Sequence, residues 1–192
     1  MCRLRVGVIG VQGAVSEHLD MLKQCDANSL WVRKTKDLEN ISALIIPGGE
    51  STTISRLMIE SDLFDVVKTL GEQGMPIYGT CAGLVLLAKQ GDGLVKKTEQ
   101  RLLELMDMKI QRNAFGNQKE SFETEISLDD IGKYPGIFIR APAIEKVWGD
   151  CKVLAKYNDK IVAARQGNLL ATSFHPELTN DKRIHEFFIE MI

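Results

Sequence analysis

The first half of the chain alternates short apolar runs with amphipathic stretches, and this alternation restricts the fold more than any other feature of the sequence. The runs predicted to be strands are residues 5–10, 29–33, 43–46 and 76–78. The stretches predicted to be helices are residues 14–25, 52–60, 63–73 and the segment directly after residue 81. Strands and helices in alternation build a mostly parallel sheet with helices on both faces. The pattern therefore predicts an α/β fold of three layers.

The second half has a different pattern, in which short strands follow one another with tight turns between them. Strands are predicted at residues 105–112, 120–126, 136–141, 152–156, 161–165 and 169–173, and a last helix at residues 181–191. Residues 158–160, Asn-Asp-Lys, are typical of a hairpin turn, so additional antiparallel strands are expected here. Because no repeat or linker interrupts the sequence, residues 1–192 are expected to form a single domain.

Composition argues against several classes of partner. The chain is 44% hydrophobic with a formal net charge of −2, and no basic run or basic-aromatic stripe points to nucleic acid or an anionic membrane. No apolar run is long enough to cross a bilayer, and the first apolar run is too short for a secretory leader, so a cytoplasmic protein is expected. The four cysteines have no zinc-site spacing, and neither a metal, nor another cofactor, nor a disulfide framework is expected.

Cys81 differs from the other cysteines in its neighbours, whereas Cys25 and Cys151 are interpreted as small buried hydrophobes. Residues 79–83, Gly-Thr-Cys-Ala-Gly, join a predicted strand directly to a predicted apolar helix. Small residues around a nucleophile suit a sharp strand-to-helix turn, in which larger side chains would clash. Such a turn holds the sulfur above the sheet edge and aims the first helical amides at the atom it attacks. This setting predicts covalent catalysis through a thiolate.

The predicted base for this thiol is His175, one of three histidines. His18 and His185 fall within predicted helices and are expected on solvated or half-buried helix faces. His175 follows a predicted strand, the proline after it favours an extended conformation, and Glu177 would then point to the same side. A His-Pro turn with a solvated glutamate is the simpler interpretation of these residues alone. Combined with Cys81, they instead predict a catalytic triad in which Glu177 orients His175.

Attack by a thiolate on a carbonyl carbon produces an oxyanion that needs preset hydrogen-bond donors. One candidate is the amide of Ala82, at the start of the predicted helix. A second candidate lies in residues 47–52, Pro-Gly-Gly-Glu-Ser-Thr, where paired glycines allow close approach of the backbone. Ser51 or Thr52 is predicted to cap the next helix. A plain strand-to-helix turn is the alternative for this segment, and no Gly-Lys-Ser/Thr sequence follows to make it a phosphate loop.

Five short motifs occur in order along the chain, and together they are far more specific than any one alone. They are residues 10–14 (Gly-Val-Gln-Gly-Ala), 47–52, 79–83 with the downstream His-Pro-Glu at 175–177, 112–118 (Arg-Asn-Ala-Phe-Gly-Asn-Gln) with Ser-Phe-Glu at 121–123, and 138–142 (Phe-Ile-Arg-Ala-Pro). In these motifs the chain resembles the triad glutamine amidotransferases, and among them the glutaminase subunits of pyridoxal 5'-phosphate synthase. The resemblance implies the flavodoxin-like class I amidotransferase fold. Asn117 departs from the arginine that is common in the family.

The resemblance also implies a role for each matching residue. Cys81 attacks the side-chain amide carbon of L-glutamine. His175 activates Cys81, protonates the departing ammonia and activates the water that opens the thioester, while Glu177 orients His175. The backbone amides of Gly49 and Ala82 form the oxyanion hole. The residues implied to hold the glutamine head group are Gly49, Glu50, Ser51, Arg112 and the backbone of Ile139 and Arg140.

Two of these inferences concern residues whose surroundings the sequence leaves open. Arg112 suits a carboxylate because its guanidinium can bind both oxygens, although a surface salt bridge would be preferred without the resemblance. Gln12 follows the first predicted strand and is expected to affect either the oxyanion hole or the contact with a partner.

The implied partner is the synthase subunit, a barrel protein that assembles into a large ring. It builds pyridoxal phosphate from ribose 5-phosphate, glyceraldehyde 3-phosphate and the delivered ammonia. The chain itself carries no recognisable phosphosugar or cofactor motif, so the acceptor chemistry must come from that partner. Free ammonia is mostly protonated at neutral pH, which makes a protected path to the second active site necessary. The resemblance further implies that the glutaminase is poorly active until it docks.

Three alternatives stay open at this point. The first is the glutaminase of another pathway, such as imidazole glycerol phosphate synthesis, and residues 112–118 with 121–123 favour the vitamin B6 family over it. The second is a stress-response or peptidase-like protein with a cysteine elbow, which would need neither Arg112 nor a late His-Pro-Glu sequence. The third is a non-catalytic binding module that keeps the fold, and the intact triad argues against it.

Overall fold

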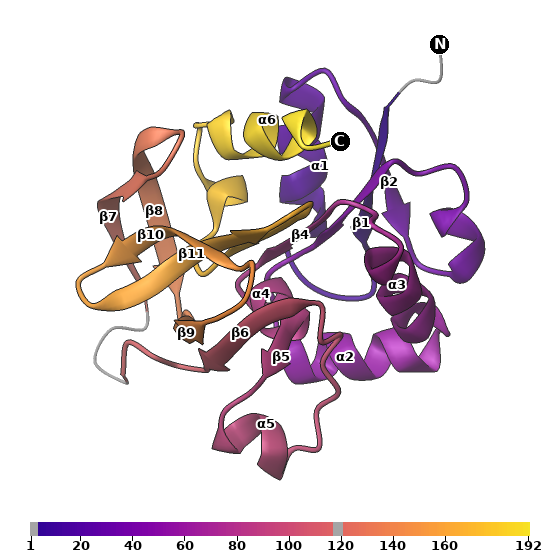
Figure 1. Cartoon of the computed structure of the whole chain (residues 1–192). Helices are drawn as coiled ribbons and strands as arrows, with labels where there is room; N and C mark the ends of the chain where they lie inside the picture. Colours follow the sequence, from indigo (N-terminus) through magenta and orange to yellow (C-terminus); the bar gives the residue numbers. More distant parts are fainter. Residues whose placement is uncertain (1–3, 117–120) are drawn as a thin grey trace.

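The computed structural model describes residues 4–116 and 121–192, which form a central sheet with helices on both of its faces (Figure 1). The helices are α1 (Val15–Gln24), α2 (Ser51–Glu60), α3 (Leu63–Glu72), α4 (Ala82–Leu87), α5 (Gly93–Lys97) and α6 (Arg183–Glu190), with the 3-10 helices η1 (Thr35–Leu38) and η2 (Pro176–Leu178). The strands are β1 (Arg5–Ile9), β2 (Asn28–Val32), β3 (Ala43–Ile46), β4 (Ile77–Thr80), β5 (Ala88–Gln90), β6 (Met106–Gln111), β7 (Ser121–Leu128), β8 (Gly132–Ile139), β9 (Ala143–Val147), β10 (Lys152–Tyr157), β11 (Lys160–Gln166) and β12 (Leu169–Thr172). The predicted three-layer α/β fold is confirmed.

The parallel half of the sheet has the strand order β2-β1-β3-β4-β12. Successive side chains of a strand point to opposite faces, so each central strand contributes to two cores. Val8 and Ile45 belong to the core under α1 and α6, whereas Ile9 and Ile46 belong to the core under α2, α3 and α4. Because these strands run in the same direction, the loops after β1, β3 and β4 meet at one edge of the sheet.

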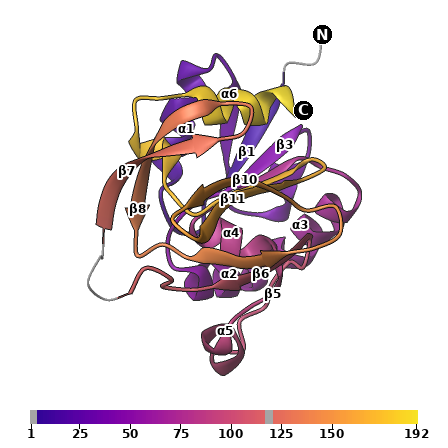
Figure 2. The ribbon, with the colours of Figure 1, turned by 60° about the vertical axis from the view of Figure 1, so that its left-hand side comes forward.

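The antiparallel half extends the sheet from β12 through β11, β10, β7 and β8. The predicted hairpin turn is confirmed, because Tyr157 pairs with Lys160 and Asn158 between them has a φ of 52°. The β7–β8 hairpin lies beside α6 (Figures 1 and 2), where the hydroxyl of Tyr134 donates to the carbonyl of Asp181 at 2.6 Å. This contact ties the hairpin to the segment that leads from η2 into α6.

Several short elements differ from the sequence-based expectation. Strand β8 begins at Gly132, earlier than predicted, because Pro135 is tolerated on a strand at the edge of the sheet. Strand β9 was not predicted, and it pairs with both β6 and β11. Helix α5 was not predicted either, and it is only five residues long. Its first turn is held by the carboxylate of Asp92, which accepts from the amides of Leu94 and Val95 at 3.0 Å each.

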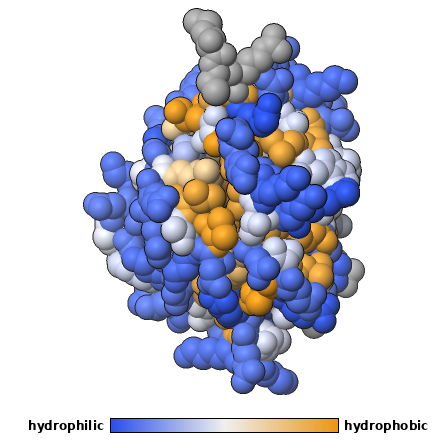
Figure 3. Space-filling model, turned by 90° about the vertical axis from the view of Figure 1, so that its right-hand side faces the viewer, coloured by the Kyte–Doolittle hydropathy of each residue, from blue (hydrophilic) through white to orange (hydrophobic). Residues whose placement is uncertain are grey.

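Figure 3 shows a face on which patches of hydrophobic side chains are broken up by polar ones. Large apolar side chains that are more than a third exposed include Trp31, Ile59 and Val66. Among the helices formed by residues 4–116 and 121–192, none is both long and apolar enough to cross a membrane.

Candidate active site

Cys81 occupies a strained turn between β4 and α4, with φ 48° and ψ −98°. A positive φ is uncommon for a residue with a side chain and needs surroundings that enforce it. A Cβ on Gly79 would lie 2.5 Å from the carbonyl group of Gly83, and a Cβ on Gly83 would lie 2.1 Å from the carbonyl oxygen of Ile46. The predicted need for small residues is therefore confirmed, because α4 packs directly against β3 and β4.

His175 and Glu177 lie next to this turn and form a short hydrogen bond. Nδ1 of His175 is 2.7 Å from Oε1 of Glu177, and both residues are buried. The amide of His175 donates to the carbonyl of Ile137 in β8 at 2.8 Å, which fixes the backbone. Glu177 lies in the short helix η2 rather than in an extended stretch, but it still reaches the same side as His175. The side chain of His175 also interacts with Cys81, and both residues line the same pocket.

The charges of His175 and Glu177 depend on each other and on their neighbours. Burial alone would lower the pKa of His175, but its interactions with Cys81 and Glu177 outweigh burial and raise it above the ordinary value. Burial alone would raise the pKa of Glu177, but His18 and the hydrogen bond from His175 outweigh burial and lower it. The arrangement therefore holds a carboxylate against an imidazolium in a largely water-free setting.

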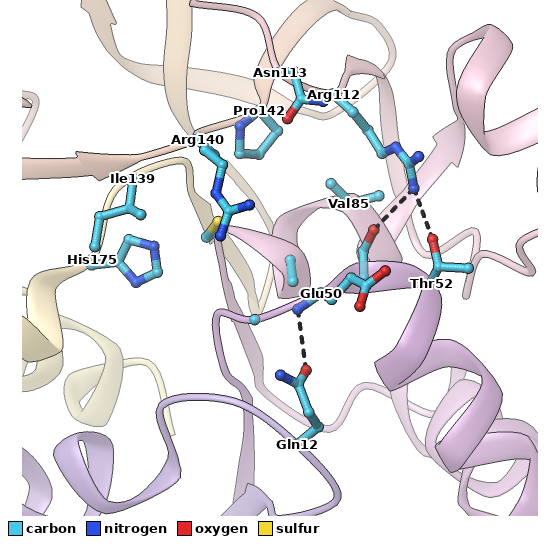
Figure 4. Close-up of a pocket in the computed structure, with 14 residues that line it drawn as sticks. Gln12, Glu50, Thr52, Val85, Arg112, Asn113, Ile139, Arg140, Pro142 and His175 are labelled. Carbon is cyan, nitrogen blue, oxygen red and sulfur yellow. Dashed lines mark hydrogen bonds between the residues drawn. The ribbon is translucent and has the colours of Figure 1, made fainter. Parts of the chain in front are cut away.

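A pocket of about 570 Å³ opens above this group (Figure 4). Apart from Glu177, which lies behind His175, every predicted site residue lines it: Gly49, Glu50, Ser51, Cys81, Ala82, Arg112, Ile139, Arg140 and His175. Gln12, Thr52, Val85, Asn113 and Pro142 complete the lining. The volume is in the range of sites that enclose small molecules. Within residues 4–116 and 121–192, no group of three or more His, Cys, Asp or Glu side chains has the geometry of a metal site.

Comparison with known proteins agrees with this geometry. The model of the SNO glutamine amidotransferase family matches residues 8–192. The chain belongs to this family. It is 50% identical to pyridoxal 5'-phosphate synthase subunit PdxT of Thermococcus onnurineus, over 97% of this chain and 98% of that protein. It is 48% identical to the protein of the same name from Brevibacillus brevis, over 98% of this chain and 97% of that one.

Comparison with solved structures shows that this chain has the fold of glutamine amidotransferases. A crystal structure described as a glutamine amidotransferase matches with a TM-score of 0.91 and 44% identity, over 97% of both chains. The structure of PurLQS from Thermotoga maritima matches with a TM-score of 0.67 over 99% of both chains, but at 12% identity it shows the fold alone. The predicted class I amidotransferase fold is confirmed by these matches.

In this family member, Arg112 crosses the pocket to the start of α2 (Figure 4). Its Nη1 donates to Oγ1 of Thr52 at 2.9 Å and to Oε1 of Gln100 at 3.0 Å, and it lies 3.5 Å from Oγ of Ser51. These partners are neutral, and among residues 4–116 and 121–192 the side chain of Arg112 forms no surface salt bridge. The prediction that Ser51 or Thr52 caps the helix is wrong, because Glu50 is the N-cap residue of α2.

Gln100 supports three residues of the pocket lining, and the sequence did not reveal it. Its Oε1 accepts hydrogen bonds from Ser51, Thr52 and Arg112, at 3.2, 3.3 and 3.0 Å. Its Nε2 is buried without a hydrogen-bond partner among the described residues. Gln100 lies in the loop after α5, outside every motif, and no local signal in the sequence distinguishes it.

The loops after β1 and β3 are hydrogen-bonded to each other on the side of the pocket opposite Arg112 (Figure 4). The side-chain oxygen of Gln12 accepts from the amide of Glu50 at 3.1 Å (Figure 4), and the carbonyl of Gly48 accepts from the amide of Ala14 at 3.1 Å. Gln12 therefore contacts the segment that contains Gly49. Asn117, which departs from the family pattern, lies outside the described residues, so its effect stays a prediction.

The expectation that His18 and His185 lie on solvated or half-buried helix faces is wrong. Both side chains are 0% exposed, and Nδ1 of His18 is 3.0 Å from Nε2 of His185. Helices α1 and α6 pack on the same face of the sheet, and their histidines meet beneath η2. The spacing of apolar residues within each helix could not reveal this, because it does not tell which two helices are neighbours. The other cysteines fit their interpretation in part, because Cys151 is buried whereas Cys25 is half-buried.

Proposed function

We propose that this protein hydrolyses L-glutamine to L-glutamate and ammonia, and that it delivers the ammonia to the synthase subunit of pyridoxal 5'-phosphate synthase. Residues 1–192 would act as a single glutaminase domain. The observation that carries the proposal is the meeting of Cys81, His175 and Glu177 at one end of a pocket whose other end presents Arg112. Relatives about half identical over nearly the whole chain carry the name pyridoxal 5'-phosphate synthase subunit PdxT, which supports the pathway.

The reaction proceeds in two halves around a thioester. The thiolate of Cys81 attacks the side-chain amide carbon, and the C–N bond breaks as the protonated ring of His175 gives its proton to the departing nitrogen. His175, now neutral, takes a proton from water, and the resulting hydroxide attacks the thioester carbon. Collapse of this second intermediate releases glutamate and returns the sulfur as thiolate beside protonated His175. Glu177 accepts the Nδ1 hydrogen of His175 throughout, which directs Nε2 to the reacting atoms.

The amides of Gly49 and Ala82 would stabilise the oxyanion of both intermediates. As the first residue of α4, Ala82 carries an amide without a partner inside its own helix. The carbonyl of Gly48 is bound by Ala14, and in a trans peptide the amide of Gly49 points to the opposite side. Both amides belong to residues that line the pocket.

The head group of glutamine would be held at the far end of the pocket. Arg112 would bind the α-carboxylate through its two-pronged guanidinium, and Glu50 would bind the α-ammonium. Ser51 and the backbone of Ile139 and Arg140 would complete the contacts. The partners of the Arg112 side chain among the described residues are neutral, which leaves its charge available for a carboxylate.

The partner would be the barrel-shaped synthase subunit in its ring assembly, and the glutaminase would reach full activity only when docked on it. The reaction as written uses no metal and no cofactor on this chain, and it involves neither nucleic acid nor a membrane. That the reaction takes place in the cytoplasm stays a prediction. Gln12, which binds the backbone next to Gly49, is well situated to transmit docking to the oxyanion hole.

The experiment is to measure glutamate release from glutamine, with and without the vitamin B6 synthase subunit. We expect strong release only in its presence, and no release with the subunit from a different glutamine-dependent synthase. Wild-type protein that released no glutamate in the presence of the synthase subunit would refute the proposed function. Equal stimulation by an unrelated synthase would instead favour another biosynthetic pathway.

A further inference from the structure

Glu177 has two carboxylate oxygens, and the proposed triad uses only one of them. Oε1 accepts from His175 at 2.7 Å, whereas Oε2 has no hydrogen-bond partner among residues 4–116 and 121–192. Nε2 of His18 lies 3.6 Å from this second oxygen. A buried carboxylate is stable only where donors face it, so His18 is a candidate donor from outside the triad.

His18 contacts three other segments at once. Its Nδ1 lies 3.0 Å from Nε2 of His185 on α6. Its Nε2 lies 3.1 Å from Oγ1 of Thr80, the residue before Cys81, as well as near Glu177. One imidazole on α1 therefore links the strand end that carries the proposed nucleophile with the helix that carries the proposed orienting carboxylate.

Only one hydrogen can lie between Nδ1 of His18 and Nε2 of His185, so one ring donates and the other accepts. Of these two arrangements, only one gives every N–H of the pair an acceptor. If His18 donated from Nδ1, neutral His185 would carry its hydrogen on its own Nδ1, which has no hydrogen-bond partner among the described residues. His18 would then also turn a lone pair towards the carboxylate of Glu177. If His185 donates from Nε2, His18 carries its hydrogen on Nε2, facing Thr80 and Glu177. Only a lone pair of His185 stays unpaired, and an unpaired buried acceptor is better tolerated than an unpaired N–H.

Both imidazoles are neutral in this arrangement. Burial lowers the pKa of His18, although Glu177 opposes the effect, and burial lowers the pKa of His185 to about 3. A second proton on His18 would force the hydrogen of His185 onto its unpartnered Nδ1. Tyr78 packs edge-on against His18 and keeps its proton, because burial raises its pKa. The charges that act on His18 are those of Glu177, of protonated His175 and of Glu17, the residue before it on α1.

We propose that His18 is a positioning residue for the reaction: His185 holds it in the tautomer with the hydrogen on Nε2, and this N–H donates to Oγ1 of Thr80 at 3.1 Å while it faces Oε2 of Glu177 at 3.6 Å. This inference rests on the proposed function. The hydrogen bond from His175 holds one oxygen of the carboxylate and the N–H of His18 faces the other, and a carboxylate held from two sides fixes the ring of His175 against Cys81. Because His18 is remote from the residues that line the head-group end of the pocket, its loss lowers kcat and leaves KM nearly unchanged.

The kinetic test uses the complex with the synthase subunit and compares His18→Leu, His18→Gln and wild type. We expect His18→Leu to lower kcat by about 10-fold, the low end of what a hydrogen bond to a charged group contributes, because the contact with Glu177 is longer than a hydrogen bond; KM should stay within about twofold. Gln carries an amide N–H near the position of Nε2, so His18→Gln should recover most of this loss. Tyr134→Phe is the matched control, because it removes a partly buried hydrogen bond near η2 without touching Glu177, and it should retain the wild-type kcat.

The tautomers are tested separately by long-range 1H–15N correlation spectra of the histidines in the wild-type protein. We expect His18 and His185 to carry their hydrogen on Nε2. A hydrogen on Nδ1 of His18, or a kcat of folded His18→Leu within about twofold of wild type, would overturn the inference. If His18→Leu does not fold, His18→Gln and the spectra decide. Wild-type protein without partner-stimulated glutamate release would refute the proposed function, and the spectra would still decide the position of the hydrogen.

Discussion

The two ends of the pocket are built in different ways. We call Cys81 and His175, together with Glu177 behind His175, the reacting wall, and Glu50, Arg112 and Arg140 the head-group wall. The residues of the reacting wall are 7%, 7% and 6% exposed, and they are held by strands and helices from both halves of the chain. In the head-group wall, Glu50 and Arg140 are exposed and Arg112 is half-buried, and all three lie at the ends of elements or in loops.

This difference separates two kinds of control. In the reacting wall, tight packing fixes the angles between sulfur, imidazole and carboxylate, so a displaced atom acts on the chemical step. In the head-group wall, exposed charges are free to adjust around a zwitterion, so a changed side chain acts on binding. Substitutions in the first wall should therefore change kcat, and substitutions in the second should change KM.

Cys81→Ala tests the reacting wall most severely. Without the sulfur no thioester can form, so we expect glutamate release in the synthase complex to fall by at least about 10³-fold. The fold should persist, because Ala is small enough for the turn between β4 and α4. The measurement is a coupled glutamate assay together with thermal unfolding. Full activity in Cys81→Ala would remove Cys81 as the nucleophile.

Gly48→Ala should disturb the geometry of the reacting wall, although Gly48 is not one of its residues. A Cβ on Gly48 would lie 2.4 Å from Cε1 of His175 and 3.4 Å from Cβ of Cys81, so the imidazole must move. A displacement of about 1 Å can cost about 100-fold in rate, and we expect a loss of kcat of this order with a smaller change in KM.

The control for this substitution is Gly93→Ala in α5, where an added Cβ meets nothing within 4 Å. It should keep the wild-type kcat in the same assay. If Gly48→Ala retained full activity, the packing of the β3–α2 loop against His175 would not be needed for the chemical step.

Arg112→Lys tests the head-group wall. Lysine keeps the positive charge but loses the planar fork that binds both oxygens of a carboxylate, so we expect KM for glutamine to rise about tenfold. We expect kcat to stay within about threefold, because the reacting wall is untouched. Arg56→Lys on the exposed side of α2 is the matched control and should leave both constants unchanged. A fall in kcat with unchanged KM would place Arg112 functionally in the reacting wall.

The contrast between the walls also explains what the sequence could and could not predict. Cys81 and its glycines are a local motif, because a strained turn needs small residues at fixed spacing. The order of the strands and helices follows from local periodicity in the same way. Gln100 was missed, because its role depends only on where a loop happens to lie next to Arg112.

His18 and His185 were missed for a related reason. Each lies beside the apolar stripe of its own helix, so burial depended on which helix faces meet, and sequence spacing does not report that. Strand β9 and helix α5 were too short for their own periodicity to be recognised, and tertiary pairing decides their existence.

The smallest expected effect is on the pH dependence of stability that arises from the buried histidines behind the reacting wall. It is tested with His185→Asn. The pKa of His185 is about 3 in the folded protein and about 6.5 when unfolded. Between pH 6.5 and 4.5 the unfolded state therefore binds more protons, and the free energy of unfolding falls as the pH falls, by up to about 1.4 kcal/mol per pH unit from this residue. The lowered pKa of buried His18 acts in the same direction. In His185→Asn the free energy of unfolding should therefore still fall with falling pH, but less steeply than in the wild type.

The two other titratable residues of this cluster, Glu177 and His175, do not change the pH dependence of stability between about pH 4.5 and 6.5. The lowered pKa of Glu177 changes stability only below about pH 4.5, and the raised pKa of His175 changes it only above about pH 6.5. Urea unfolding at pH 5 and pH 6.5 should thus give a shallower pH slope for His185→Asn than for wild type, while Tyr134→Phe keeps the wild-type slope. Equal slopes would mean that His185 titrates alike in both states, and a solvated His185 could not hold His18 in the tautomer that faces Glu177.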